Sequence, residues 1–258
     1  MAVAVLTRDP VDAQGYASVL APLGLEVLAM PVTKTVPAAD PGALSRALDT
    51  GDYAAIVVAS PRAAHELARA VAALASVRTT MPDLPDVWAV GPATKRALDI
   101  AKLPAHQPAD VRDGAELANK LVASRSLAGK RVLVPRAEEG RVDALEILRA
   151  AGAEVVDVVA YRTVAVAADD ATLAQGADLL IRGGAAICAV FAPSQVTALA
   201  AVMAARDHEL AALVTQFCAI GETTAAALRA AGVRDVAVAA APSPEGMAQA
   251  VRSVYPRR

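Results

Sequence analysis

Short apolar runs alternate with longer Ala- and Leu-rich stretches along the whole chain. The short runs are rich in β-branched residues and the long ones repeat apolar positions with helical period, which predicts alternating strands and helices. Because the short runs are apolar at nearly every position, they are typical of strands buried on both faces of a parallel sheet. The pattern therefore predicts an α/β protein with mostly parallel sheets. The predicted strands span residues 3–6, 26–29, 54–59, 87–90, 131–134, 154–159, 186–191, 217–220 and 236–239.

The second half of the chain nearly repeats the first half. Four blocks recur in the same order with only small changes in spacing, which predicts two domains of one design. In the first block, VLTR (5–8) matches LVPR (133–136) and LGLEV (23–27) matches AGAEV (151–155), both at a spacing of 128 residues. In the other three blocks, Pro61 matches Pro193 at 132, Gly91 matches Gly221 at 130, and Gly114 matches Gly246 at 132.

Two stretches at equivalent positions of the repeats are predicted to be linkers by which the chain crosses between domains. They are VTKTVPAADP at 32–41 and YRTVAVAADD at 161–170. Cutting there gives a discontinuous domain of residues 1–35 with 165–258, and a second domain of residues 36–164, each with one full set of blocks. We expect a ligand to bind between the domains or at the carboxyl ends of their strands.

Composition excludes several functions. With 25 basic and 27 acidic residues the net charge is -2, so no global positive field attracts nucleic acid or an anionic membrane. Cys188 and Cys218 lie in apolar runs without neighbouring His or carboxylate clusters, which predicts neither a metal site nor a catalytic thiol. No apolar run reaches the roughly 20 residues of a membrane span, and the N-terminus lacks the pattern of a signal peptide. We expect a cytoplasmic protein.

The chain lacks the phosphate-binding loop, the dinucleotide-binding glycine motif and the serine-hydrolase elbow, so no cofactor is predicted. Small residues and hydroxyls instead open a helix after four of the predicted strands. Each could be an ordinary helix cap, but four in register suggest helix N-termini that bind carboxylates. Arginines follow the first strand of each repeat and are candidates for the same task. The candidate substrate-binding residues are Arg8, Ser60, Gly91, Thr94, Arg136, Ser194, Gly221, Thr223 and Thr224.

Tyr161 is a further candidate, because it ends the strand at 154–159 where the second linker begins. That position would place a phenol at the domain boundary. The alternative is a tyrosine packed there for structural reasons alone.

The motifs together resemble one family over the whole chain. They are TR after the first strand, SP after the third, VGPAT, KRVLVPRAEEGR, YRT, FAPS, AIGETTAAAL and PSPEGMAQAV, and in this order they resemble uroporphyrinogen-III synthase. The resemblance implies two flavodoxin-like domains joined by a two-stranded linker, the first assembled from both ends of the chain. It also implies a lyase that closes the linear tetrapyrrole hydroxymethylbilane, losing water and inverting the last pyrrole ring, without cofactor or metal.

The resemblance also implies roles for single residues. Tyr161 would assist departure of the substrate hydroxyl, with Ser60, Thr94, Ser194, Thr223 and Thr224 near the substrate. One departure is Ala192, where the family often has serine, so symmetric use of the two turns is in doubt. The expected partner is the tetrapyrrole alone, bound by a monomer. The alternative function is a non-catalytic two-domain sensor of a small anion.

Overall fold

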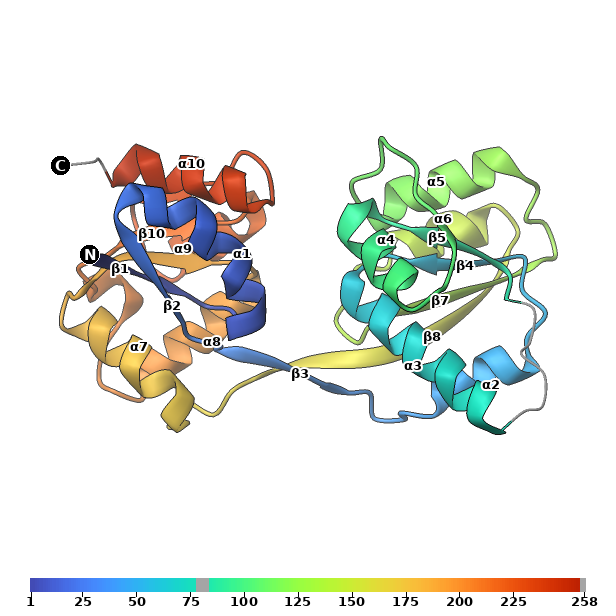
Figure 1. Cartoon of the computed structure of the whole chain (residues 1–258), viewed down its shortest axis with the longest axis horizontal. Coiled ribbons are helices and arrows are strands. Elements are labelled where there is room, and N and C mark those ends of the chain that lie inside the picture. Colours follow the sequence, from blue (N-terminus) through green and yellow to red (C-terminus); the bar gives the residue numbers. More distant parts are fainter. Residues whose placement is uncertain (78–83, 256–258) are drawn as a thin grey trace. The chain divides into compact units, whose positions relative to one another are not determined.

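The computed structural model describes residues 1–77 and 84–255. The chain is an α/β protein with two sheets, each built on parallel strands, which confirms the predicted fold class. The two sheets belong to two compact units (Figure 1). Unit 1 comprises Met1–Lys34 and Val164–Arg258, and unit 2 comprises Thr35–Thr163.

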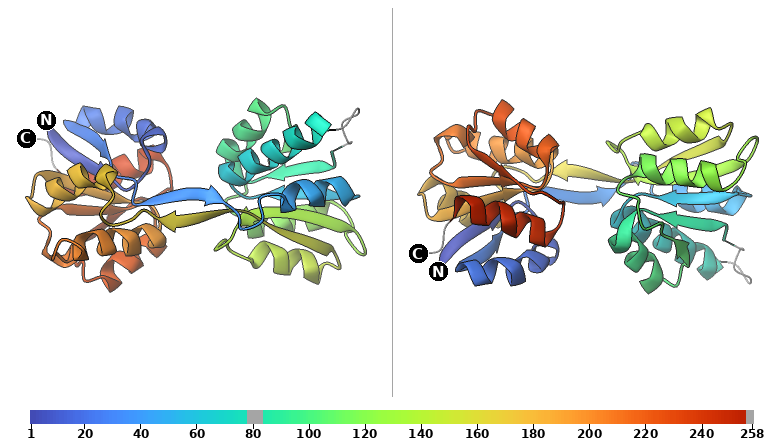
Figure 2. Two further views of the ribbon diagram at one scale, coloured as in Figure 1. Left: turned by 90° about the horizontal axis from the view of Figure 1, so that it is seen from below. Right: turned by 90° about the horizontal axis from the view of Figure 1, so that it is seen from above.

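Unit 1 is a three-layer sandwich around a five-stranded sheet of order β11-β10-β9-β1-β2. One face is covered by α7, α8 and α9 and the other by α1 and α10, and Figure 2 shows helices on both sides of the sheet. The strands are β1 (Ala2–Leu6), β2 (Leu25–Ala29), β9 (Ala185–Val190), β10 (Gln216–Ala219) and β11 (Val236–Val238). The helices are α1 (Pro10–Leu20), α7 (Ala171–Ile181), α8 (Pro193–Ala204), α9 (Glu222–Ala230) and α10 (Pro244–Val254), with short 3-10 turns at Ala21–Leu23 and Leu210–Ala212.

Unit 2 repeats this architecture around a six-stranded sheet of order β3-β8-β7-β4-β5-β6. Its faces are covered by α2, α3 and α4 on one side and by α5 and α6 on the other. The strands are β3 (Thr33–Pro37), β4 (Ala55–Val58), β5 (Asp86–Ala89), β6 (Ala105–His106), β7 (Arg131–Ala137) and β8 (Glu154–Ala165). The helices are α2 (Ala43–Thr50), α3 (Pro61–Val77), α4 (Gly91–Ile100), α5 (Gly114–Ser124) and α6 (Asp143–Ala150).

The register of the sheets supports the repeat spacing residue by residue. In unit 1, Val5 pairs with Cys188 across β1 and β9. In unit 2, Leu133 pairs with Ile56 across β7 and β4. Leu133 lies 128 residues after Val5 (133 minus 5), and Cys188 lies 132 after Ile56 (188 minus 56). The two spacings read from the sequence therefore hold in three dimensions, and positions of the two units can be equated individually.

The fourth block is the exception, and its predicted spacing of 132 is wrong. The side chain of Asp113 caps α5 by accepting a hydrogen bond from the amide of Glu116, and the side chain of Ser243 caps α10 in the same way from the amide of Gly246. The caps are 130 residues apart (243 minus 113). Matching the two glycines misaligned the block because the helix of unit 2 has its glycine at the first position, whereas that of unit 1 has proline there.

The predicted linkers form strands. The first contains β3 and the second contains the end of β8, and these two strands are neighbours in the sheet order. The chain passes from unit 1 to unit 2 at Lys34–Thr35 and returns at Thr163–Val164. Strand β1 is hydrogen-bonded to β9, which lies after the second passage. The N-terminal segment thus completes a sheet with the C-terminal part of the chain.

Candidate functional site

A cavity of about 280 Å³ opens at the carboxyl edge of the sheet in unit 2. Its walls come from the residues that follow β4 and β5, the end of β7, Tyr161 within β8, and the start of α5 and α6. The floor is apolar, with Val57, Val134 and Leu145. Carboxyl edges of parallel sheets are the usual ligand sites of doubly wound folds. The polar groups on this edge are therefore the candidates for chemistry.

Ser60 and Tyr161 meet at this cavity. The Ser60 Oγ lies 3.1 Å from the Tyr161 Oη, and the tyrosine is only 7% exposed. Ser60 also accepts a hydrogen bond of 3.1 Å from the amide of Ala63, which caps the start of α3. A hydroxyl that accepts from an amide can still donate its proton to the phenol. In that arrangement the phenolic proton is free to be donated to a ligand in the cavity.

A bulge between β7 and β8 changes the position of Tyr161, whose ring packs in the core on the α2–α4 side of the sheet. Arg136 pairs with Val159, but Ala137 pairs with Tyr161, so β8 advances two residues while β7 advances one. In a regular ladder the partner of Ala137 would be Ala160. Because side chains alternate between the faces of a sheet, the extra residue changes the face to which Tyr161 projects.

Arg136 also lines the cavity, but its guanidinium is already engaged. It donates to the two carboxylate oxygens of Asp157 at 2.7 and 2.9 Å and to the carbonyls of Ala137 and Glu138 at 2.8 and 2.9 Å. These contacts use four of its five N–H groups, and the hydrogen bond to Asp157 raises the pKa of Arg136. The geometry favours a structural role that joins the end of β7 to Asp157 of β8.

A more accessible cation stands at the rim of the cavity. Arg141 is 72% exposed, donates to Asp113 at 3.2 Å and pairs with Asp143. Exposed ion pairs contribute about 0–1 kcal/mol, so a ligand carboxylate can replace them at little cost. Arg141 is thus better placed than Arg136 to bind an anion.

The remaining candidates of unit 2 lie beside the cavity. Gly91 opens α4 with φ 70°, a left-handed conformation that glycine adopts readily. Thr94 is 2% exposed in the first turns of α4. Neither is among the residues that line the cavity, although Val90, which caps the same helix, is.

The other candidates belong to unit 1. Ser194 and Thr223 are exposed in the first turns of α8 and α9, Gly221 caps α9, and Thr224 is 1% exposed. Arg8 lies in a cluster of its own and donates to the Tyr16 hydroxyl and to Asp12, each at 3.1 Å. The structure thus brings Ser60, Arg136 and Tyr161 around one cavity and distributes the rest over other helix ends.

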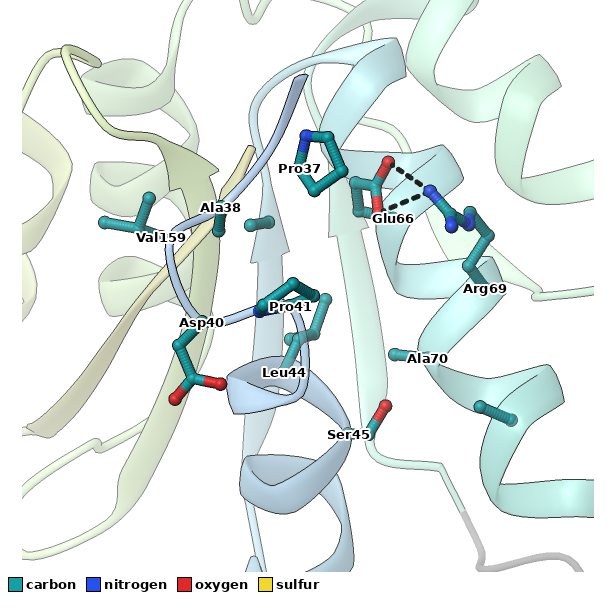
Figure 3. A pocket seen from close by; sticks show the side chains of 12 residues that line it. Pro37, Ala38, Asp40, Pro41, Leu44, Ser45, Glu66, Arg69, Ala70 and Val159 are labelled. Carbon is teal, nitrogen blue, oxygen red and sulfur yellow. Dashed lines mark hydrogen bonds and ion pairs between the residues drawn. The ribbon is translucent and has the colours of Figure 1, made fainter. Parts of the chain in front are cut away.

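A second cavity of about 190 Å³ in unit 2 is lined by the segment before α2 and by α2, α3 and β8. Figure 3 shows Arg69 at this cavity, joined to Glu66 on the same helix. Leu44 and Ala70 lie nearby, and no predicted site residue is among the lining. This cavity offers little for catalysis compared with the one at the Ser60–Tyr161 pair.

Both cysteines are buried. Burial raises the pKa of Cys218 to about 12 and that of Cys188 further still, so neither thiol ionises near neutral pH. Among the residues that the structure describes, no group of three or more His, Cys, Asp or Glu side chains is placed to hold a metal ion. No helix within residues 1–77 and 84–255 is long and apolar enough to cross a membrane.

Comparison with known proteins identifies the family of the chain. The sequence model described as HEM4, uroporphyrinogen-III synthase HemD, matches residues 14–249. The chain belongs to the uroporphyrinogen-III synthase family.

The fold is also similar to two solved structures. One is a mutant uroporphyrinogen III synthase from the extremely thermophilic bacterium Thermus thermophilus, with TM-score 0.58, 23% identity and 98% of each chain covered. The other is the uroporphyrinogen-III synthetase from Helicobacter pylori 26695, with TM-score 0.58, 17% identity and coverage of 98% of this chain and 99% of the other. No match is found among curated proteins.

The cavity of this uroporphyrinogen-III synthase family member is also lined by residues that the sequence analysis did not predict. Asp113, Gly114 and Ala144 all line it, yet none was a candidate. Asp113 could have been found as an N-cap in the fourth repeated block. Gly114 and Ala144 carry no chemistry of their own, and their role is visible only once the segments that contain them are brought together.

Proposed function

We propose that this chain is a uroporphyrinogen-III synthase, which cyclises hydroxymethylbilane with loss of water and inversion of the last pyrrole ring. The observation that carries the proposal is the family match over residues 14–249, joined to a phenol and a hydroxyl at the carboxyl edge of one sheet. The roles proposed for single residues rest on the cavity of unit 2 and on helix N-termini in both units.

Tyr161 is the proposed proton donor. Its O–H lies at the wall of an apolar cavity, where the phenolic proton can pass to the departing hydroxyl. The C–O bond then breaks with release of water, and the lone pair of the adjacent pyrrole nitrogen supplies the electrons. The substituted α-carbon of the last ring attacks the methylene carbon that has lost the hydroxyl, which gives a spiro intermediate. The bond from this α-carbon to the neighbouring methylene bridge then breaks and forms again at the other α-carbon of the ring, which inverts the ring. Loss of the proton from that second carbon restores the pyrrole and returns a proton to the phenolate. The reaction is redox-neutral, so these steps require no redox cofactor.

Ser60 is the proposed positioning residue. Its Oγ is fixed by the amide of Ala63 and lies 3.1 Å from the phenol. It therefore holds the Tyr161 Oη at one place and directs its proton. General-acid catalysis of this kind contributes typically about 10²–10⁴-fold. Much of the remaining acceleration would come from orientation of the folded substrate.

The substrate carboxylates are proposed to bind at the rim and at helix N-termini. Exposed Arg141 and the first turn of α5 border the cavity of unit 2. In unit 1, Ser194 and Thr223 occupy the first turns of α8 and α9. Helix N-termini bind anions through their free amides, and many weak contacts of this kind suit a ligand with several carboxylates.

The test is an assay with hydroxymethylbilane generated enzymatically, followed by oxidation and separation of the I and III porphyrin isomers. Because the linear tetrapyrrole closes spontaneously to the I isomer, the III to I ratio is the informative quantity. We expect the III isomer to predominate without added metal, nucleotide or flavin. A ratio equal to that of the heat-denatured control would reject the proposal and favour a non-catalytic sensor.

A further inference from the structure

The cavity of unit 2 depends on three small residues that converge. Ala59 follows β4, Ala144 lies in α6, and Gly114 opens α5. A Cβ placed on Gly114 would lie 3.5 Å from the Cβ atoms of both alanines. All three residues line the cavity. The space exists because none of them has a side chain larger than a methyl group.

Each of these positions has a defined counterpart in unit 1. Phe191 follows β9 as Ala59 follows β4, at the spacing of 132 that the sheet register gives. Pro244 is the first residue of α10 as Gly114 is of α5, 130 residues on.

The third counterpart is Tyr16, which lies 128 residues before Ala144. The left-handed glycines that precede β2 and β8 establish this spacing. Gly24 and Gly152 have φ 79° and 81°, and both are 8 residues beyond the position in question (24 minus 16 and 152 minus 144).

In unit 1 these larger side chains pack together. The rings of Tyr16 and Phe191 meet edge to face with centroids 4.9 Å apart, and Tyr16 is 5% exposed. The Arg8 guanidinium lies 4.9 Å from the Phe191 centroid and 5.6 Å from that of Tyr16, and it donates to the tyrosine hydroxyl. Pro244 borders the same helix, 4.0 Å from the Cβ position of Gly15. Unit 1 fills with its own rings the place that unit 2 leaves open.

We propose that the two units are functionally unequal: the cavity of unit 2 takes one pyrrole ring of the substrate, and Tyr16 and Phe191 close the equivalent place in unit 1. This inference rests on the proposed function for the identity of the ligand. If both places were open, a pyrrole ring of the substrate could bind in either unit. With the place in unit 1 closed, a ring can bind only beside Tyr161. Tyr16 and Phe191 thus determine where a ring binds.

The first test uses porphobilinogen, a single pyrrole with two carboxylate side chains, as the probe. In ¹H–¹⁵N spectra of the full chain we expect it to shift the amides of Gly114 and Gly140, which line the open cavity, and to leave Gly15 beside Tyr16 unmoved. Comparable shifts in both units would overturn the inference, as would the absence of binding to unit 2.

The second test changes the size of the side chains at these positions in each unit. Ala144→Phe should fill the cavity of unit 2 and weaken probe binding roughly ten- to hundredfold, the effect of excluding one ring from an apolar site. Ala72→Phe, at an exposed position of α3, is the matched control and should bind the probe as wild type does. Phe191→Ala should open unit 1, so that Gly15 now shifts with the probe.

If thermal unfolding shows that Ala144→Phe is not folded, Ala59→Phe places the same side chain at the loop after β4. Unchanged probe affinity in a folded filling variant would refute the inference.

Failure of this inference is distinguishable from failure of the proposed function. A wild-type chain that forms the III isomer but binds the probe equally in both units rejects only the inequality of the units. A chain inactive on hydroxymethylbilane but with one probe site rejects only the reaction.

Discussion

Replacing Tyr161 by phenylalanine removes the proposed acid and keeps the ring that packs in the core of unit 2. The lost contact is the 3.1 Å hydrogen bond to Ser60. A neutral hydrogen bond contributes about 1 kcal/mol to stability, so Tyr161→Phe should lower the free energy of unfolding by about that amount. Turnover should fall much further, by about 10²-fold, because general-acid assistance is lost while water can still protonate the leaving hydroxyl.

Ser60→Ala should affect stability more and turnover less than Tyr161→Phe does. It removes both the cap of α3 and the contact with the phenol, and loss of a serine cap costs roughly 0.5–2 kcal/mol. Its turnover should fall by less than about tenfold, since the phenol remains and only its orientation is loosened. Because the two hydroxyls act as one pair, the double variant should be about as slow as Tyr161→Phe alone.

Tyr53→Phe is the matched control for the tyrosine. Tyr53 is also buried in unit 2, and its hydroxyl donates to the carbonyl of Ala47 at 2.8 Å, away from the cavity. It should lose similar stability and keep full turnover. The measurements are urea unfolding for stability and the initial rate of III-isomer formation for turnover. If Tyr161→Phe matches Tyr53→Phe in rate, the phenol is structural and the acid must be sought elsewhere.

Three further outcomes follow from the structure. Cys218→Ala should leave the III to I isomer ratio unchanged, because the buried thiol, with its pKa at about 12, supplies no nucleophile; loss of activity in a folded variant would contradict this. Gly91→Ala should destabilise the chain by about 1 kcal/mol more than Gly221→Ala in thermal melts, because both sites leave room for a Cβ but only Gly91 has a left-handed φ; equal melting temperatures would reject the reasoning. Arg125 holds the pKa of Asp86 below its usual value, so this carboxylate stabilises the fold above its unfolded pKa and that contribution is lost as pH falls through the folded pKa. Asp86→Asn should therefore cost less than about 1 kcal/mol at neutral pH, and its difference from wild type should shrink toward about pH 2.

The architecture could be predicted from the sequence because strands buried on both faces of a sheet are continuous apolar runs. Strands such as β4 and β9 are apolar at every position, and the repeat indicated that they occupy equivalent places in two similar domains. The two strands that were missed, β3 and β6, lack this pattern. Strand β3 is largely exposed, and β6 has only two residues, so neither produces an apolar run.

The candidate site was predicted only in part, for a physical reason. Ser60 and Tyr161 could be proposed because hydroxyls at strand ends suggest chemistry, and the structure places them together. Arg136 was proposed because it follows the first strand of its repeat, but its partner Asp157 lies on the neighbouring strand, and that pairing depends on a register that composition does not reveal. Ala59 and Ala144 matter only by their small size, which has no signature in an alanine-rich chain.

The chain leaves unit 1, forms unit 2 and then returns, so unit 1 is completed last during synthesis. Unit 2 is one continuous segment, Thr35–Thr163, and can fold as soon as it leaves the ribosome. Strand β1, by contrast, is the first to be made, yet its ladder partner β9 begins only at Ala185. Contacts so distant in sequence form slowly. We therefore expect the N-terminal strand to remain unpaired on one side while the middle of the chain folds. During that interval its open edge is the part of the nascent protein most exposed to aggregation.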